Sequence, residues 1–103
     1  MQRITLVRYT TRPETSAQNE ALSRAVFAEL KKEQPKGVAY SLWRNGDEFV
    51  HLFINTTNAD AGVVTELPSF KAFQKDSQVR FTAPPEVTRL DINLVDSYGL
   101  PGR

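Results

Sequence analysis

The sequence lacks cysteine altogether and holds a single histidine, His51. The absence of cysteine excludes disulfide bonds, thiolate metal sites and cysteine nucleophiles. A metal site built from imidazoles usually needs two or three of them, so one histidine argues against such a site. The five glycines are scattered along the chain and form no phosphate-binding loop. The sequence therefore predicts no metal and no cofactor.

A strong charge imbalance and a long apolar run are also missing. Thirteen lysines and arginines stand against twelve acidic residues, a net charge of +1, whereas nucleic-acid-binding proteins usually carry a basic excess. No stretch approaches the roughly 20 apolar residues that span a bilayer. The N-terminal residues have the pattern of a strand and not of a secretory signal. We therefore expect a cytoplasmic protein with neither a nucleic acid nor a membrane as its partner.

Hydrophobic periodicity predicts two helices and four strands in one domain, residues 1–103. The expected ranges are, in chain order, a strand at 3–10, a helix at 14–34, strands at 38–44 and 47–55, a helix at 68–79 and a strand at 86–96. Two interleaved βαβ units follow this order. The order therefore predicts a ferredoxin-like α+β fold, βαββαβ, with an antiparallel sheet and both helices on one face.

The dipeptide Asn45-Gly46 is a strong signal for a tight hairpin turn of type I′. A two-residue loop at this dipeptide would pair Tyr40 with His51 across the hairpin. Strand alternation makes both faces of the hairpin largely apolar, with Tyr40 and His51 on one face and Trp43 on the other. Helices can cover one face, so we expect a second copy of the chain to cover the other, giving a homodimer. The sequence leaves open which face meets the helices.

Three features of the chain resemble one known family. They are the order of elements over 103 residues, the hairpin at Asn45-Gly46, and the run LPSFKAF at 67–73 before the last strand. Together they resemble the antibiotic biosynthesis monooxygenase-like family of dimeric α+β barrels. The resemblance implies a ferredoxin-like fold, a homodimer and a small-molecule ligand.

The same resemblance implies a range of activities, because a fold does not fix a function. The family includes cofactor-free quinone-forming monooxygenases, haem-degrading enzymes and members with no known activity. Haem-degrading members carry a histidine on the second helix, and the segment 68–79 has none. The first hypothesis is therefore a cofactor-free monooxygenase or isomerase-type enzyme acting on a small aromatic or apolar metabolite. The alternatives are a non-catalytic small-molecule-binding or stress-response module, and a purely structural dimer.

His51 and Tyr40 are the candidate catalytic residues. Imidazole titrates naturally near neutral pH, so His51 can act as a general base or as a hydrogen-bond donor in a pocket. The phenol of Tyr40, on the same face, can orient a phenolic or quinone-like substrate. Each residue also has a plainer interpretation. His51 can be a buried or interface histidine satisfied by one neighbour, and Tyr40 a core aromatic whose hydroxyl reaches a partner.

Four further residues are candidates for binding the substrate. Asn55 lies at a strand end, where such pockets open, and can hold a polar group of the substrate. Phe53, Phe70 and Phe73 can form the pocket walls, although the spacing of the last two is also that of core residues on a helix. Tyr9 lies at another strand end, where we expect a structural role.

Overall fold

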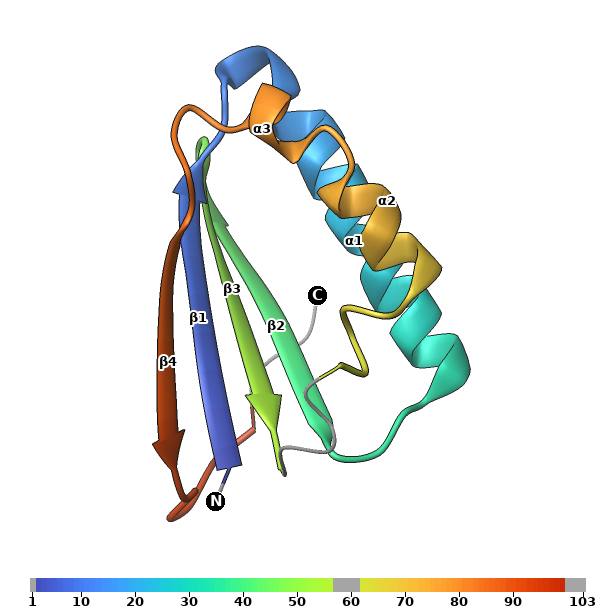
Figure 1. Ribbon diagram of the computed structural model, residues 1–103, viewed down its shortest axis with the longest axis vertical. Helices are drawn as coiled ribbons and strands as arrows, with labels where there is room; N and C mark the ends of the chain where they lie inside the picture. Colours follow the sequence, from blue (N-terminus) through green and yellow to red (C-terminus); the bar gives the residue numbers. More distant parts are fainter. Residues whose placement is uncertain (1, 57–61, 100–103) are drawn as a thin grey trace.

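Strands and helices follow one another along the chain in the predicted order (Figure 1). The computed structural model describes residues 2–56 and 62–99. The elements are β1 Gln2–Thr10, the 3₁₀ turn η1 Pro13–Thr15, α1 Ser16–Glu33, β2 Val38–Asn45, β3 Glu48–Asn55, α2 Pro68–Gln74, α3 Ser77–Arg80 and β4 Glu86–Ile92. The helix predicted at 68–79 is divided in two, the last strand is shorter than 86–96, and the other predicted boundaries differ by no more than two residues.

The four strands form one antiparallel sheet in the order β2-β3-β1-β4. The helices α1, α2 and α3 all lie on one side of this sheet (Figure 1). This is the ferredoxin-like α+β arrangement, so the predicted fold class is confirmed. Of the helices formed by residues 2–56 and 62–99, none is long and apolar enough to cross a membrane.

The division of the second helix lies at Asp76, whose φ of +60° is left-handed. Aspartate is among the residues that tolerate this conformation. The side chain of Arg80 turns back across the break and donates hydrogen bonds to the carbonyl oxygens of Phe73 (2.6 Å) and Lys75 (3.2 Å). The prediction of one continuous helix is therefore wrong, because a guanidinium takes the place of the next helical turn at these carbonyls.

The last strand ends early because its partner strand ends there. β4 is an edge strand that pairs with β1, and Gln2, the first residue of β1, pairs with Ile92, the last residue of β4. Beyond this pair, the backbone N–H of Leu94 donates to Oε1 of the Gln2 side chain at 2.6 Å. The predicted extension of the strand to residue 96 is wrong because β4 ends where it reaches Gln2, the first described residue of β1.

The β2–β3 hairpin turns one residue later than predicted, at Gly46-Asp47. Within the hairpin the left-handed φ is that of Gly46, +63°, so the expected type I′ turn is also wrong. The register is shifted by two residues, and Tyr40 pairs with Phe53 and not with His51. A shift of two leaves every side chain on its predicted face, because the side-chain period of a strand is two.

Contacts of Asp47 with Thr11, which follows β1, and with Ser16, the first residue of α1, explain where the hairpin turns. The backbone carbonyl of Asp47 accepts a hydrogen bond from the N–H of Thr11 at 2.8 Å, which extends the β1–β3 ladder by one residue. Its carboxylate accepts a second from the hydroxyl of Ser16 at 2.6 Å. Because these partners are distant in sequence, the local dipeptide does not determine the register.

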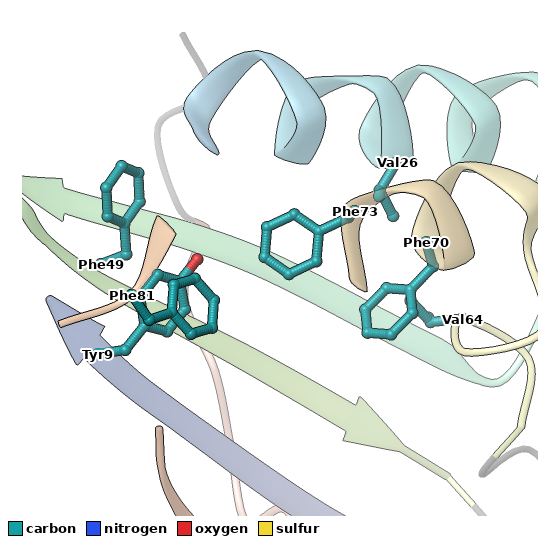
Figure 2. Packing of buried hydrophobic residues seen from close by; sticks show 7 residues of the cluster. All are labelled: Tyr9, Val26, Phe49, Val64, Phe70, Phe73 and Phe81. Carbon is teal, nitrogen blue, oxygen red and sulfur yellow. The ribbon is translucent and has the colours of Figure 1, made fainter. Parts of the chain in front are cut away.

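The face of the sheet that meets the helices is the one that carries His51. A buried apolar cluster lies between the two layers (Figure 2). Its members are Tyr9, Val26, Phe49, Val64, Phe70, Phe73 and Phe81. The rings of Tyr9 and Phe81 stack with centroids 3.8 Å apart. The question that the sequence leaves open is thereby answered: the His51 face packs against the chain's own helices.

The opposite face of the sheet, which we call the outer face, is apolar and exposed. By strand alternation it carries Leu6, Trp43, Leu90 and Ile92, whose exposed fractions lie between 37% and 50%. Trp43 lies on this face as predicted. An exposed apolar patch on one face of a sheet is typical of a surface that binds another molecule.

Candidate active site

A cavity of about 410 Å³ lies between the sheet and the helices α2 and α3. This volume falls within the roughly 300–1,000 Å³ of small-molecule sites. Six aromatic rings line it: Tyr9, His51, Phe53, Phe70, Phe73 and Phe81. The polar side chains in the lining are Arg3, Thr5, Asn55, Thr65, Gln74, Ser77 and Arg89. In the part of the chain that the structure describes, no three His, Cys, Asp or Glu side chains come together as a metal site.

The cavity brings together five of the six residues proposed from the sequence. These five are His51, Phe53, Asn55, Phe70 and Phe73. Tyr40 is not in the lining; its ring stacks on those of Phe27, at 4.5 Å, and Phe53, at 4.3 Å. The contact between Tyr40 and His51 exists, but it is diagonal across the hairpin and not between paired residues.

His51 lies in the middle of β3 with 2% of its surface exposed. Tyrosine hydroxyls bond both ring nitrogens: Tyr9 contacts Nε2 at 2.6 Å and Tyr40 contacts Nδ1 at 2.5 Å. Burial lowers the pKa of His51 to about 4, so the ring is neutral at neutral pH. A neutral imidazole has one N–H, so one tyrosine donates to the ring and the other accepts from it.

Asn19, a fully buried residue of α1, fixes which tyrosine donates. Its Nδ2 donates to the Tyr9 oxygen at 2.8 Å, and its Oδ1 accepts from Nε of Arg80 at 3.0 Å. A guanidinium can only donate, so it identifies Oδ1 and leaves the amide nitrogen facing Tyr9. The Tyr9 oxygen is then an acceptor for Asn19, and its O–H donates to Nε2 of His51. The single N–H of His51 therefore lies on Nδ1 and donates to the Tyr40 oxygen.

Arg80 is a buried cation whose hydrogen-bonding partners are neutral. It is 3% exposed, and its donors reach Asn19 and the carbonyls of Phe73 and Lys75. The guanidinium also lies over the rings of Phe73 and Phe81, at 5.1 and 5.8 Å from their centroids. No carboxylate within the described ranges forms an ion pair with it. Burial lowers the pKa of Arg80 below its usual value, but a guanidinium remains protonated in proteins.

The charge of Arg80 acts on Tyr9. Burial raises the pKa of Tyr9 to about 12, while the hydrogen bond from Asn19 and the charge of Arg80 lower it. Burial also raises the pKa of Tyr40, more strongly. A negative charge that forms on the Tyr9 oxygen, or on a ligand oxygen beside it, is therefore stabilised by Asn19 and Arg80. The arrangement can take a proton onto a neutral imidazole and stabilise the anion that the proton leaves behind.

Sequence reasoning misses Tyr9, Asn19 and Arg80 as site residues. For Tyr9 it predicts a structural role, whereas the hydroxyl contacts His51 and the side chain lines the cavity. A signal for Asn19 exists: it lies on the buried stripe of α1 with Ser23 and Val26, and a polar residue in such a stripe needs a partner. Arg80 carries no comparable signal, because the expected helix ends one residue before it.

The sequence and the fold can be compared with those of known proteins. No family model and no curated protein matches the sequence. Solved structures do match: Rv0793 from Mycobacterium tuberculosis has a TM-score of 0.78 at 19% identity, over 93% of this chain and 100% of that one. An antibiotic biosynthesis monooxygenase has a TM-score of 0.74 at 15% identity, over 91% and 100%. SnoaB, a cofactor-independent oxygenase from Streptomyces nogalater, has a TM-score of 0.67 at 14% identity, over 91% and 95%.

These similarities confirm the resemblance at the level of the fold. The chain has the ferredoxin-like α+β fold of antibiotic biosynthesis monooxygenase-like proteins over almost its whole length. At such identities the shared architecture says nothing about which side chains face the cavity. The chemistry available to this chain therefore depends on its own side chains, Tyr9, His51 and their hydrogen-bonding partners.

The tautomer of His51 tests the inferred hydrogen-bond directions, and it can be read directly because the chain has one histidine. We expect the N–H on Nδ1 at neutral pH. Asn19→Asp should move it to Nε2, because a carboxylate only accepts. The Tyr9 O–H must then donate to the new carboxylate, and the Tyr9 oxygen accepts from His51. The ¹⁵N chemical shifts of the imidazole, in protein labelled at histidine, distinguish the two forms.

Asn93→Asp is the matched control, since it makes the same chemical change at an exposed position. It should leave the imidazole shifts unchanged. An Nε2–H imidazole in the unaltered protein would contradict the direction inferred for the Tyr9 hydroxyl. A variant at Asn19 that keeps its proton on Nδ1 would contradict the role given to that amide.

The low pKa of His51 should also make the folded state less stable in mild acid. Unfolding returns the pKa from about 4 to 6.5, so between these values the unfolded chain binds a proton that the folded chain does not. The free energy of unfolding should therefore fall by about 2 kcal/mol from pH 7 to pH 5. Urea denaturation at both pH values measures this loss. In His51→Gln the loss should be much smaller, and an equal loss in both proteins would count against the burial argument.

Proposed function

We propose that this protein is a cofactor-independent monooxygenase that oxidises a small hydroxylated aromatic compound to a quinone. The observation that carries the proposal is the hydrogen-bonded chain Tyr40–His51–Tyr9, which ends in a cavity lined with aromatic rings. The similarity of the fold to that of SnoaB, a cofactor-independent oxygenase, supports the same class of reaction.

The first step is removal of the phenolic proton of the substrate. Tyr9 accepts this proton while its own passes to Nε2 of His51, at 2.6 Å. Tyr40 accepts the N–H on Nδ1 and so holds the imidazolium ring in place. Because the pKa of His51 is low, the imidazolium is stable only while a phenolate lies beside it. The proton is therefore held briefly and returned easily.

The phenolate then reacts with molecular oxygen directly. One electron passes from the phenolate to O₂, and the two radicals combine in a C–O bond at the ring carbon para to the hydroxyl. The proton held by His51 returns through Tyr9 to the outer oxygen, giving a hydroperoxide. Loss of the proton on the same ring carbon breaks the O–O bond, forms the second carbonyl and releases hydroxide. The released proton and hydroxide form water, so phenol and O₂ give quinone and water without an external reductant.

The remaining lining residues hold the substrate for this reaction. Phe53, Phe70 and Phe73 present apolar ring surface to an aromatic substrate. Asn55, 7% exposed at the end of β3, offers an amide to a polar substituent. Positioning of this kind turns a bimolecular encounter into a reaction within one complex.

Oxygen uptake with 1,5-dihydroxynaphthalene tests the proposed activity. The protein should accelerate its conversion to the hydroxynaphthoquinone, measured with an oxygen electrode and by the absorbance of the quinone. His51→Gln and Tyr9→Phe should each lower the rate by about 10²–10⁴-fold, the usual contribution of general acid–base catalysis. Tyr40→Phe should have a smaller effect, because Tyr40 lies outside the cavity lining.

Arg24→Gln, an exposed change on α1, is the control for these variants and should retain the full rate. If the His51 and Tyr9 variants oxidise 1,5-dihydroxynaphthalene as fast as the unaltered protein does, the proposal is wrong.

The second candidate function is binding of a small aromatic molecule without catalysis. One observation favours it: both ring nitrogens of His51 are satisfied by tyrosines of the chain itself, as in a structural network. In that case the naphthol binds in the cavity but oxygen is consumed at the background rate. The oxygen-uptake measurement, combined with calorimetric titration of the naphthol, separates the two candidates.

We further propose that a second copy of the chain covers the outer face of the sheet. Leu6, Trp43, Leu90 and Ile92 each expose more than a third of their surface there. A two-fold axis through this face would bury the same apolar residues from both copies.

Leu90→Lys tests this association by placing a charge on the outer face. Sedimentation velocity should give twice the mass of one chain for the unaltered protein and the mass of one chain for the variant, because an unpaired buried charge is costly. Val79→Lys introduces the same charge at an exposed position of α3 and should remain dimeric. An unaltered protein that sediments as a single chain would refute the proposed dimer.

A further inference from the structure

We infer that the substrate of the cavity is an aromatic carboxylate, whose charged group is bound by Arg89 of β4. The inference rests on the proposed function for the reacting end of the molecule. The charged group of the ligand is inferred from the residues that line the cavity, independently of the reaction.

The lining of the cavity carries positive charge that its own residues do not balance. Arg3 and Arg89 contribute to it, and the described residues of the lining include no aspartate and no glutamate. Arginine side chains at the edge of an apolar cavity attract anionic ligands, because the low-dielectric walls strengthen their field. A neutral metabolite would use neither charge.

The two arginines differ in what they already bind. Nε of Arg3 lies 3.0 Å from Oδ1 of Asp91, so this guanidinium is paired with a carboxylate. Arg89 forms neither an ion pair nor a hydrogen bond with the part of the chain that the structure describes. Its planar fork of donors is therefore available to a ligand, and Arg89 is the better anchor for an anion.

The sheet register places Arg89 at a useful distance from the reacting groups. Arg89 pairs with Thr5, and Thr5 pairs with Phe53, so these three side chains cross the helix-facing side of the sheet in one row. His51 lies in the next row, paired with Val7. Strand spacing separates the Cα atoms of Arg89 and His51 by about 12 Å. Two fused rings lying over Thr5 and Val7 would connect them, with one end at Arg89 and the other at His51.

The number and shape of the donors favour a carboxylate over a phosphate. A guanidinium fork matches a planar carboxylate with two parallel hydrogen bonds. A doubly charged phosphate would call for a second free cation, and the other arginine of the lining is already paired with Asp91. The single free guanidinium of Arg89 therefore suits a singly charged group.

A matched pair of ligands tests this inference by calorimetric titration. The acid is 6-hydroxy-2-naphthoate, and the neutral analogue of the same shape is 6-hydroxy-2-naphthamide. The unaltered protein should bind the acid about ten-fold or more tightly than the amide, the effect of a charge-assisted hydrogen bond. Arg89→Gln should abolish this preference by weakening binding of the acid alone. Arg24→Gln, another exposed arginine, should preserve it.

The ¹⁵N signals of His51 show whether both ligands occupy this cavity, since each should shift them on binding. Equal affinity of the unaltered protein for the acid and the amide would overturn the inference. So would the absence of binding of both ligands. A preference for the acid that persists in Arg89→Gln would overturn it as well. Failure of the proposed function looks different. If the acid binds through Arg89 while 1,5-dihydroxynaphthalene consumes no oxygen, the monooxygenase is excluded and the anion site stands. If the naphthol is oxidised but the acid is not preferred, this inference alone fails.

Discussion

His51 is an imidazole enclosed between a sheet and a layer of helices, and each of its nitrogens needs a hydrogen-bonding partner there. The neighbouring strands supply these partners, Tyr9 from β1 and Tyr40 from β2. The hydroxyl of Tyr9 is in turn held by Asn19 of α1, whose amide is oriented by Arg80 at the end of α3. Satisfying one buried ring thus connects three strands and two helices. The break in the second helix belongs to the same network, because Arg80 also binds the carbonyls at the end of α2.

Arg80 and Arg89, neither of which forms an ion pair within the described residues, give the site two positive charges of different character. Arg80 is enclosed and bonded to neutral groups, so its field acts on Tyr9 with little screening by water. Arg89 is exposed on the edge strand, where solvent weakens its field until a ligand displaces the water. In the proposed reaction, the inner charge would stabilise an anion that forms on the substrate, whereas the outer one would select an anion that arrives with the ligand. Such a division suits a molecule with an acidic substituent at one end and a phenol at the other.

Much of the fold follows from alternation and element order, which are properties of short segments. The faces of the β2–β3 hairpin are predicted correctly even though its register is not, because a shift of two residues preserves the side-chain period. The register itself depends on Asp47, which is held by Thr11 and Ser16 from another part of the chain. The end of β4 likewise depends on where β1 begins. Each error thus arises where a distant segment, and not the local sequence, fixes the boundary.

The candidate site divides in the same way. His51, Phe53 and Asn55 can be predicted because they share one face of one strand, and the cavity lies on that face. Asn19 and Arg80 cannot, because their roles depend on how the helices lie over the sheet. The three solved structures reported above share 14–19% of their sequence with the chain, and a likeness of this kind extends to the architecture and not to the side chains that face the cavity. The fold supplies a cavity between sheet and helices, and the side chains that the helices bring to Tyr9 decide whether a proton can leave a ligand there. Function in this architecture is therefore specified by the contacts that alternation along the strands does not reveal.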